Sequence, residues 1–220
     1  MNTRRWLASA ALLTLVAGGS AARAANLIQN GTFDTNTTGW TNVAIWDGTR
    51  DANSNPNSGS DQVPITSSGP VTCTDSVQVV PVSAGTGYDA SADILVASAL
   101  TNVAGQASVN VDFCSDANCA AWPSTIVGSF SMGPANNSNA LDTWLHVASG
   151  AQIAPAGAQA AIIFLNPCAN ATGTFTANFD NIVLQPAAIG EVPTLDHGGI
   201  LLLAAALAVA ALLALGRART

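Results

Sequence analysis

The sequence predicts an all-β fold, an antiparallel β-sandwich, for the part of the chain between its two apolar ends. Apolar and polar residues alternate with period two along much of this part. Breaks that contain glycine or proline separate the alternating runs, and no run has the spacing of an amphipathic helix. Many short strands with turn signals between them are typical of antiparallel sandwiches.

The predicted strands are assigned from this alternation in chain order. They span residues 71–82, 88–96, 107–114, 126–132, 143–153, 158–165 and 174–184. The second is the clearest, because its apolar side chains occupy every second position from Tyr88 to Val96 and its aspartates lie between them. Residues 83–87 and 154–157 supply turn signals. About 165 residues remain between the two ends, enough for one domain with a core.

The N-terminal end has the three parts of a signal peptide. Arg4 and Arg5 are basic, residues 6–17 are apolar but too few to span a bilayer, and Ala22-Arg23-Ala24 is an A-x-A cleavage site. We therefore expect residues 1–24 to direct export by the general secretory route and to be removed by signal peptidase. The domain then covers residues 25–188.

The C-terminal end predicts a transmembrane helix over residues 198–216. This uncharged apolar run would be roughly 28 Å long, close to the hydrocarbon thickness of a bilayer. Arg217 and Arg219 follow in the basic end, residues 217–220, which we expect on the cytoplasmic side, with the domain outside.

A short motif in the linker, residues 189–197, precedes that helix. Val192, Pro193, Thr194 and Leu195, followed by an apolar helix and a basic end, resemble the IPTL-CTERM sorting tails of Gram-negative bacteria, relatives of the PEP-CTERM tails. Val192 replaces the usual isoleucine, and Asp196 begins a different continuation from the family's Ser-Glu-Trp-Gly. The resemblance implies an inner-membrane intermediate processed by an exosortase-type protease and then a place at the cell surface or in the extracellular matrix. The alternative is a plain membrane anchor.

The charges of residues 25–188 exclude one class of partner. This part has one basic residue, Arg50, against eleven aspartates and no glutamate. Nucleic acid is not expected as a partner, because binding it requires a lysine or arginine footprint. An acidic, lysine-free surface fits an exported protein.

Four cysteines, all in this domain, predict disulfides formed in an oxidising compartment. Cys114 and Cys119 bracket a short loop that is easily closed, which leaves Cys73 to pair with Cys168. A zinc site is the alternative, but no C-x-x-C spacing occurs.

Two segments resemble CenC-type carbohydrate-binding modules, which are galactose-binding-like jelly rolls. Residues 26–34, NLIQNGTFD, with Gly39-Trp40 after them, look like the family's first strand, and residues 179–184, FDNIVL, look like its last. The resemblance covers residues 26–185. It implies a jelly-roll sandwich in which the first and last strands lie together and in which Trp40 and Trp144 pack in the core.

The same resemblance implies a structural calcium ion. The matching ligands are Asp34, Asp180 and the backbone oxygen of Thr32, and calcium takes such oxygen ligands. The alternative is that Asp34 ends a strand and Asp180 caps a turn.

Sugar binding requires exposed aromatic rings flanked by polar side chains. Trp46, with Asp47 and Arg50 close in sequence, and Trp122, after the short cysteine loop, are the candidates. Each could instead cover the edge of the core.

Catalysis is not expected, because His146 is the only histidine of the domain and no catalytic triad can be argued from spacing. We expect an exported surface protein that binds a polysaccharide or other glycan, with an adhesive or structural function in the envelope or exopolysaccharide matrix. The alternative is a structural surface protein without a sugar site, and a hydrolase is the weaker third possibility.

Overall fold

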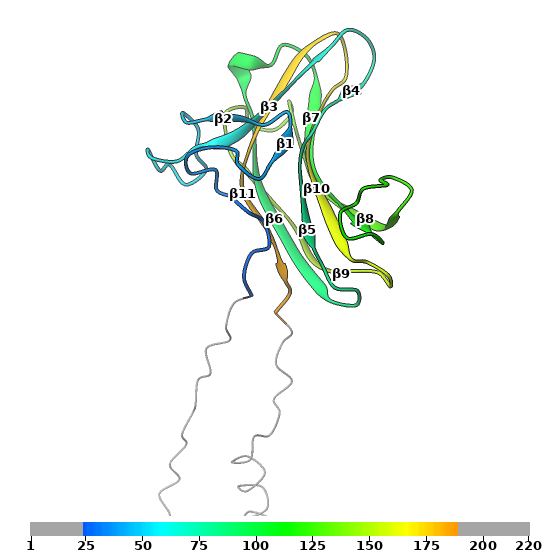
Figure 1. Ribbon diagram of the computed structural model, residues 1–220. Coiled ribbons are helices and arrows are strands. Elements are labelled where there is room, and N and C mark those ends of the chain that lie inside the picture. The colour runs from blue at the N-terminus through cyan, green and yellow to red at the C-terminus, as the bar shows by residue number, and fades with distance from the viewer. Residues whose placement is uncertain (1–23, 189–220) are drawn as a thin grey trace, which may run out of the picture.

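The computed structural model describes residues 24–188, which form two antiparallel sheets packed face to face (Figure 1). Sheet A has the order β1 (Thr41–Asn42), β5 (Ser76–Pro81), β10 (Ala160–Ala169), β7 (Gly105–Cys114) and β8 (Ile126–Asn136), with β4 (Thr72–Cys73) also paired to β10. Sheet B has the order β2 (Ile45–Asp47), β3 (Ser60–Ser67), β11 (Gly173–Pro186), β6 (Gly87–Val96) and β9 (Leu145–Ile153). The only helical element in the described range is a 3-10 turn, Ser98–Leu100. The predicted all-β sandwich is confirmed.

The connection of the strands is that of a jelly roll. When the eight longer strands are counted along the chain, sheet B contains the first, eighth, third and sixth, in that order. Sheet A contains the second, seventh, fourth and fifth. Consecutive strands therefore cross from one sheet to the other, except β7 and β8, which are neighbours in sheet A.

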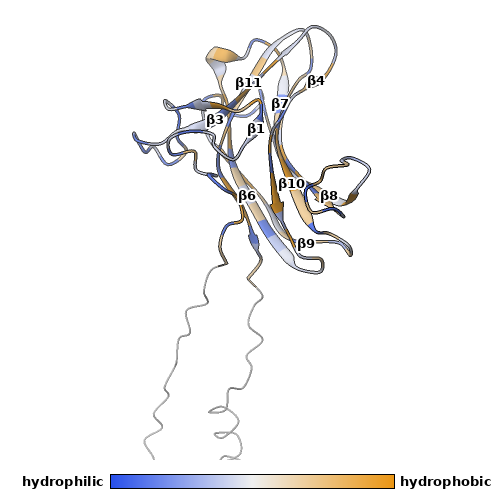
Figure 2. Ribbon diagram, in the orientation of Figure 1, coloured by the Kyte–Doolittle hydropathy of each residue, from blue (hydrophilic) through white to orange (hydrophobic). Residues whose placement is uncertain are grey.

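The core lies between the sheets and follows the predicted alternation. In β6 the side chains from Tyr88 to Val96 at every second position are buried. Figure 2 shows β10 as largely apolar and the loop after β2 as hydrophilic. Trp40 is 6% exposed and its ring lies 5.6 Å from that of Phe33, so its predicted place in the core is confirmed.

One expected strand is absent. Residues 26–34 form turns instead of a strand, because Asn30 and Phe33 have positive φ angles of 51° and 45°. The segment nevertheless lies beside β11, as the resemblance implies. The Leu27 amide donates to the Leu184 carbonyl at 2.8 Å, and the Ile182 amide donates to the Gly31 carbonyl at 2.9 Å.

Both predicted disulfides are confirmed. Cys73 in β4 and Cys168 in β10 are register partners and are bonded across 95 residues of sequence. Cys114 at the end of β7 bonds to Cys119, five residues later.

The predicted chain ends lie outside the described residues. This applies to nearly all of the signal peptide, to the sorting motif at residues 192–195 and to the membrane helix at residues 198–216. Within residues 24–188, no helix has the length and apolarity needed to cross a membrane.

Candidate functional site

The outer face of sheet A is polar across its middle strands. Because alternate side chains of a strand point to opposite faces, Asn110 and Asp112 of β7 face outward while their neighbours enter the core. Phe164 of β10 is the register partner of Asn110, so an aromatic side chain and an amide lie side by side on this face.

Trp122 covers this face from the loop between β7 and β8, which we call the Trp122 loop (residues 115–125). The Ser115 amide donates to the Thr125 carbonyl at 2.9 Å and closes the base of the loop. Cys114 and Cys119 fix its first turn. The loop therefore carries Trp122 on a covalently closed support.

The indole of Trp122 is held at two points and is still 46% exposed. Its Nε1 donates to Oδ2 of Asp112 at 2.9 Å, and its ring lies 5.4 Å from that of Phe164, centroid to centroid. A tryptophan with a satisfied N–H and an exposed ring is a preorganised apolar surface.

Polar side chains surround Trp122 in a groove of about 230 Å³, which we call the sheet A groove. Its lining residues are Asp75, Asn110, Asp112, Trp122, Phe164 and Asn166. Ser131 Oγ donates to Asn110 Oδ1 at 2.6 Å, and Asn166 Nδ2 donates to the Thr74 carbonyl at 2.7 Å. Within the described residues, Nδ2 of Asn110 and Oδ1 of Asp112 have no hydrogen-bond partner and can meet a ligand.

The outer face of sheet B is covered by the loop between β2 and β3, which we call the cover loop (residues 48–59). Its Ala52 amide donates to Asp180 Oδ2 at 2.8 Å, and Asn53 Nδ2 donates to Asn181 Oδ1 at 3.0 Å. Figure 1 shows this loop projecting from the side of the sandwich opposite the Trp122 loop.

Trp46 fixes the two ends of the cover loop. Its Nε1 donates to the Phe33 carbonyl at 2.8 Å. A Cβ atom added to Gly48 would lie 2.4 Å from the ring, and one added to Gly59 would lie 2.6 Å from Nε1, so the indole rests on both glycines. Although Trp46 is 43% exposed, these contacts give it a structural function at the base of the loop.

Asp47 connects the cover loop to sheet B. Arg50 Nη1 donates to Asp47 Oδ2 at 2.7 Å, and the same oxygen accepts from Asn178 Nδ2 at 3.1 Å. Burial alone would raise the pKa of Asp47, but hydrogen bonds from Thr49, Arg50 and Asn178 lower it overall. Asp47 is therefore a charged anchor for Arg50.

A cleft of about 530 Å³ lies between the cover loop and residues 95–99 and 142–144; we call it the sheet B cleft. Leu95 and Trp144 line it from below, and Arg50, Asp51, Asn55 and Asp142 supply polar groups. Hydrogen bonds from the hydroxyl and amide of Ser98 lower the pKa of Asp142, so its carboxylate is ionised at neutral pH.

The predicted calcium ligands contact residues of the cover loop. Ser58 Oγ is 3.2 Å from both the Thr32 carbonyl and Asp34 Oδ1, and its single proton can satisfy one of them. Asp180 is fully buried and accepts from two backbone amides. Burial, with smaller effects of Asp51 and Asp93, raises its pKa to about 7. Thr32, Asp34 and Ser58 supply oxygen types that calcium takes. No three His, Cys, Asp or Glu side chains of residues 24–188 gather around one point as a metal site.

The four predicted sugar-binding residues thus separate between the two faces. Trp122 lies in the sheet A groove, Arg50 lines the sheet B cleft, and Trp46 and Asp47 support the cover loop without lining the cleft. Trp144 was expected in the core but is half-buried on the cleft. Asn110, Asp112 and Asn166 were missed, although their polar side chains at alternate strand positions were visible in the sequence.

Comparisons with known proteins identify the fold and no family. No protein-family profile and no curated protein sequence matches the chain. The enzymatically active domain of tailspike protein 4 of bacteriophage CBA120 aligns with a TM-score of 0.51 and 15% identity, covering 73% of this chain and 21% of that one. The chain thus spans about a fifth of the tailspike chain.

Carbohydrate-binding modules are also among the similar structures. The C-terminal family 22 module of Clostridium thermocellum Xyn10B aligns with a TM-score of 0.49 and 13% identity, over 77% of this chain and 98% of the module. TmCBM61, solved with beta-1,4-galactotriose, aligns with a TM-score of 0.46 and 13% identity, over 74% of this chain and 99% of that one.

Proposed function

We propose that this protein is a non-catalytic carbohydrate-binding protein and that the sheet A groove holds the glycan. Trp122 is the observation that carries this proposal. Its ring is nearly half exposed, yet Asp112 and Phe164 hold it in position, so less side-chain conformational entropy is lost when a sugar ring stacks on it. Asn110 offers an unused donor and Asp112 an unused acceptor beside it, which suits sugar hydroxyls.

The charge of the groove selects for a neutral glycan. Asp75 and Asp112 line it, and no lysine or arginine does. An acidic polysaccharide would bring like charge against these carboxylates, which disfavours binding. We therefore expect neutral oligosaccharides to bind and oligogalacturonate to be excluded.

The test is binding of the full-length chain to immobilised neutral and acidic oligosaccharides, comparing Trp122→Ala with wild type. Loss of the stacked ring should weaken binding of the neutral glycans at least about tenfold. Trp46→Phe is the matched control, because Trp46 is similarly exposed but supports the cover loop. Unchanged binding in Trp122→Ala would place the glycan elsewhere. Absence of binding to every glycan would favour the alternative, a structural surface protein that contacts other proteins.

Export and sorting belong to the same proposal. A signal peptide at residues 1–24 and the tail from residue 189 onward would deliver the domain to the cell surface, with the motif at Pro193 and Thr194 read by an exosortase-type protease. Substituting either residue should then leave the uncleaved chain in the inner membrane. Mass spectrometry of the mature C-terminus tests this, because an end near Thr194 indicates sorting and an intact Thr220 indicates a plain anchor.

Calcium at Thr32 and Asp34 is a further part of the proposal. The shared Ser58 hydroxyl leaves one of two oxygen acceptors without a proton, which a cation would compensate. An ion that binds only the folded protein raises its melting temperature by mass action. We expect Ca²⁺ to raise the melting temperature relative to EDTA and Asp34→Asn to remove the increment. An identical melting curve in Ca²⁺ and EDTA would exclude the site.

A further inference from the structure

We infer that the sheet B cleft is a second glycan site, specific for neutral sugars, and that one chain therefore binds sugar on two opposite faces. This inference rests on the proposed carbohydrate-binding function but concerns a different surface. The cleft, at about 530 Å³, falls in the size range of small-molecule sites.

The cleft combines an apolar floor with unused hydrogen-bonding groups. Leu95 is 4% exposed and points away from the core, so it forms part of the floor, and the half-buried Trp144 adds an aromatic ring. Arg50 donates through Nη1 to Asp47, and the rest of its guanidinium has no partner among the described side chains. Because a guanidinium carries five N–H groups, Arg50 can donate to ring hydroxyls while it stays anchored.

The charges of the cleft exclude an anionic ligand. The charge of Arg50 is compensated by Asp47 at 2.7 Å. Asp51 and Asp142 line the same cleft, so its net charge is negative even with Arg50 included. A uronic acid or phosphate would meet this field unfavourably, whereas a neutral sugar uses the carboxylates as acceptors.

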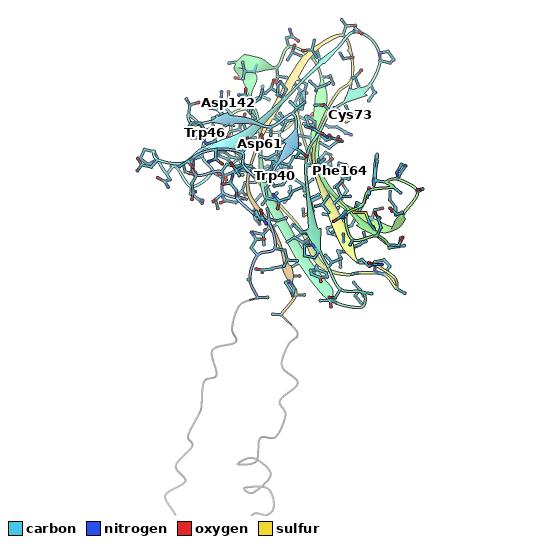
Figure 3. The ribbon with its side chains drawn as sticks, viewed as in Figure 1. Trp40, Trp46, Asp61, Cys73, Asp142 and Phe164 are labelled. Carbon is cyan, nitrogen blue, oxygen red and sulfur yellow. A yellow bond between two sulfur atoms is a disulfide. The ribbon has the colours of Figure 1, made fainter. Side chains whose placement is uncertain are left out.

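The two sites can be occupied together. Figure 3 places Asp142 and Phe164 on opposite sides of the sandwich. Both described chain ends leave from another end of the molecule, where the Leu27 amide bonds to Leu184 of β11 and the Ala187 amide bonds to Gly87 (Figure 1). Neither face is blocked by the other or by the described chain ends. A single chain could therefore bridge two polysaccharide strands.

The experiment is the stoichiometry of neutral trisaccharides on the purified full-length chain, measured by calorimetry. The probes are the β-linked trisaccharides of glucose, galactose, mannose and xylose, with trigalacturonate as the acidic counterpart. Because the full-length chain includes the apolar segment 198–216, it is purified in detergent. The number of sugar molecules bound per chain does not depend on how many chains share one micelle. We expect two molecules per chain for wild type, one for Trp122→Ala, one for Trp144→Ala and none for the double variant.

Two conservative variants distinguish a lost contact with the sugar from a disturbed fold. Trp144→Phe keeps an aromatic face and should retain the second site with less than a tenfold loss in affinity. Arg50→Lys keeps the charge opposite Asp47 but loses the planar fork, and should weaken the second site about tenfold without affecting the first.

Each outcome decides between the two claims. One molecule per chain, lost in Trp122→Ala and unaffected by Trp144→Ala, would overturn the second site and leave the proposed function intact. One molecule lost only in Trp144→Ala would keep the cleft and overturn the groove. No binding by any neutral trisaccharide would overturn both, and trigalacturonate binding that needs Arg50 would overturn the neutral specificity.

Discussion

The two faces of the sandwich build their candidate sites in different ways. The sheet A groove is made from strand side chains in register, with Phe164 of β10 opposite Asn110 of β7, and one loop adds Trp122. The sheet B cleft is made by a loop that lies over the sheet. The position of this cover loop depends on its hydrogen bonds to Asp180 and Asn181 and on its contact with the indole of Trp46.

The two sheets also differ in their buried carboxyl groups. The two fully buried carboxylates, Asp61 and Asp180, both belong to strands of sheet B. Asp61 Oδ1 accepts from the Ile45 amide at 3.1 Å, while Oδ2 has no partner among the described residues. Buried polar groups without partners destabilise a fold. Asp180 lies under the cover loop, whereas Asp61 lies on the core-facing side of β3, the side of Val63. Both carboxyl groups make the stability of sheet B depend on pH.

Removing the disulfides should give the largest change in the free energy of unfolding, and the change should differ between the two bridges. Replacing Cys73 and Cys168 by serine removes a bridge across 95 residues and should lower the free energy of unfolding by about 4–5 kcal/mol. Replacing Cys114 and Cys119 removes a bridge across five residues and should cost about 2 kcal/mol, with loss of glycan binding at the groove. Urea unfolding and glycan binding measure both. Equal stability losses would contradict the loop-closure argument.

The pH dependence of stability should reveal the buried carboxyl groups of the sheet B strands. Burial raises the pKa of Asp61 to about 7, well above its unfolded value. The folded state then binds the extra proton, so the contribution of Asp61 to stability is greatest below pH about 4 and falls as the pH rises to about 7, by at most about 1.4 kcal/mol per pH unit.

Two substitutions test whether stability changes with pH in the predicted direction. Asp61→Asn should flatten the fall between pH 4 and 7 in urea unfolding. Asp142→Asn should remove a contribution of the opposite sign, because hydrogen bonds from Ser98 lower the pKa of Asp142 and its contribution is lost as the pH falls. A wild-type stability that rises between pH 4 and 7 would mean that Asp61 and Asp180 do not dominate.

The sequence predicts strands well where alternation is regular and poorly where polar or proline residues interrupt it. The faces of β6 and β7 follow directly from their alternation. The sequence did not reveal β3, because it begins Ser60-Asp61 and contains Pro64. The proline is tolerated because β2 pairs only with residues 60–62, so that Pro64 lies where this side of β3 has no partner strand.

The sites were only partly predictable for a related reason. The sequence offered Trp122 as a candidate because it follows the small cysteine loop and lies outside the predicted strands. Its partner Phe164 lies 42 positions later in an apolar strand that reads as core, and only the register of β10 with β7 shows that it faces outward. Trp46 supports the cover loop and Trp144 lines the cleft because this loop, whose path alternation does not specify, lies over sheet B.

Trp46→Ala should disturb the sheet B face and leave the sheet A face unchanged, with an intermediate loss of stability. It removes a half-exposed indole, its hydrogen bond to Phe33 and the support of both glycines at the ends of the cover loop. We expect a loss of about 1–3 kcal/mol and disturbance of the sheet B cleft. Amide hydrogen exchange should increase in residues 48–59 and remain unchanged in residues 115–125. Equal changes in both loops would show that the faces are coupled.

The smallest effects should come from a matched pair of carboxylates, Asp112→Asn and Asp142→Asn. Each changes one oxygen to an amide on a surface group, and each group accepts a local hydrogen bond, from Trp122 in the groove and from Ser98 at the cleft. We expect losses below about 1 kcal/mol for both, because exposed charged groups contribute little to stability. Their effects on binding should differ by face: Asp112→Asn should weaken only the glycan site that depends on Trp122, and Asp142→Asn only the one that depends on Trp144. A loss at both sites from either single change would show that the two faces do not bind independently, and calorimetry of the two variants with the same trisaccharide distinguishes these results.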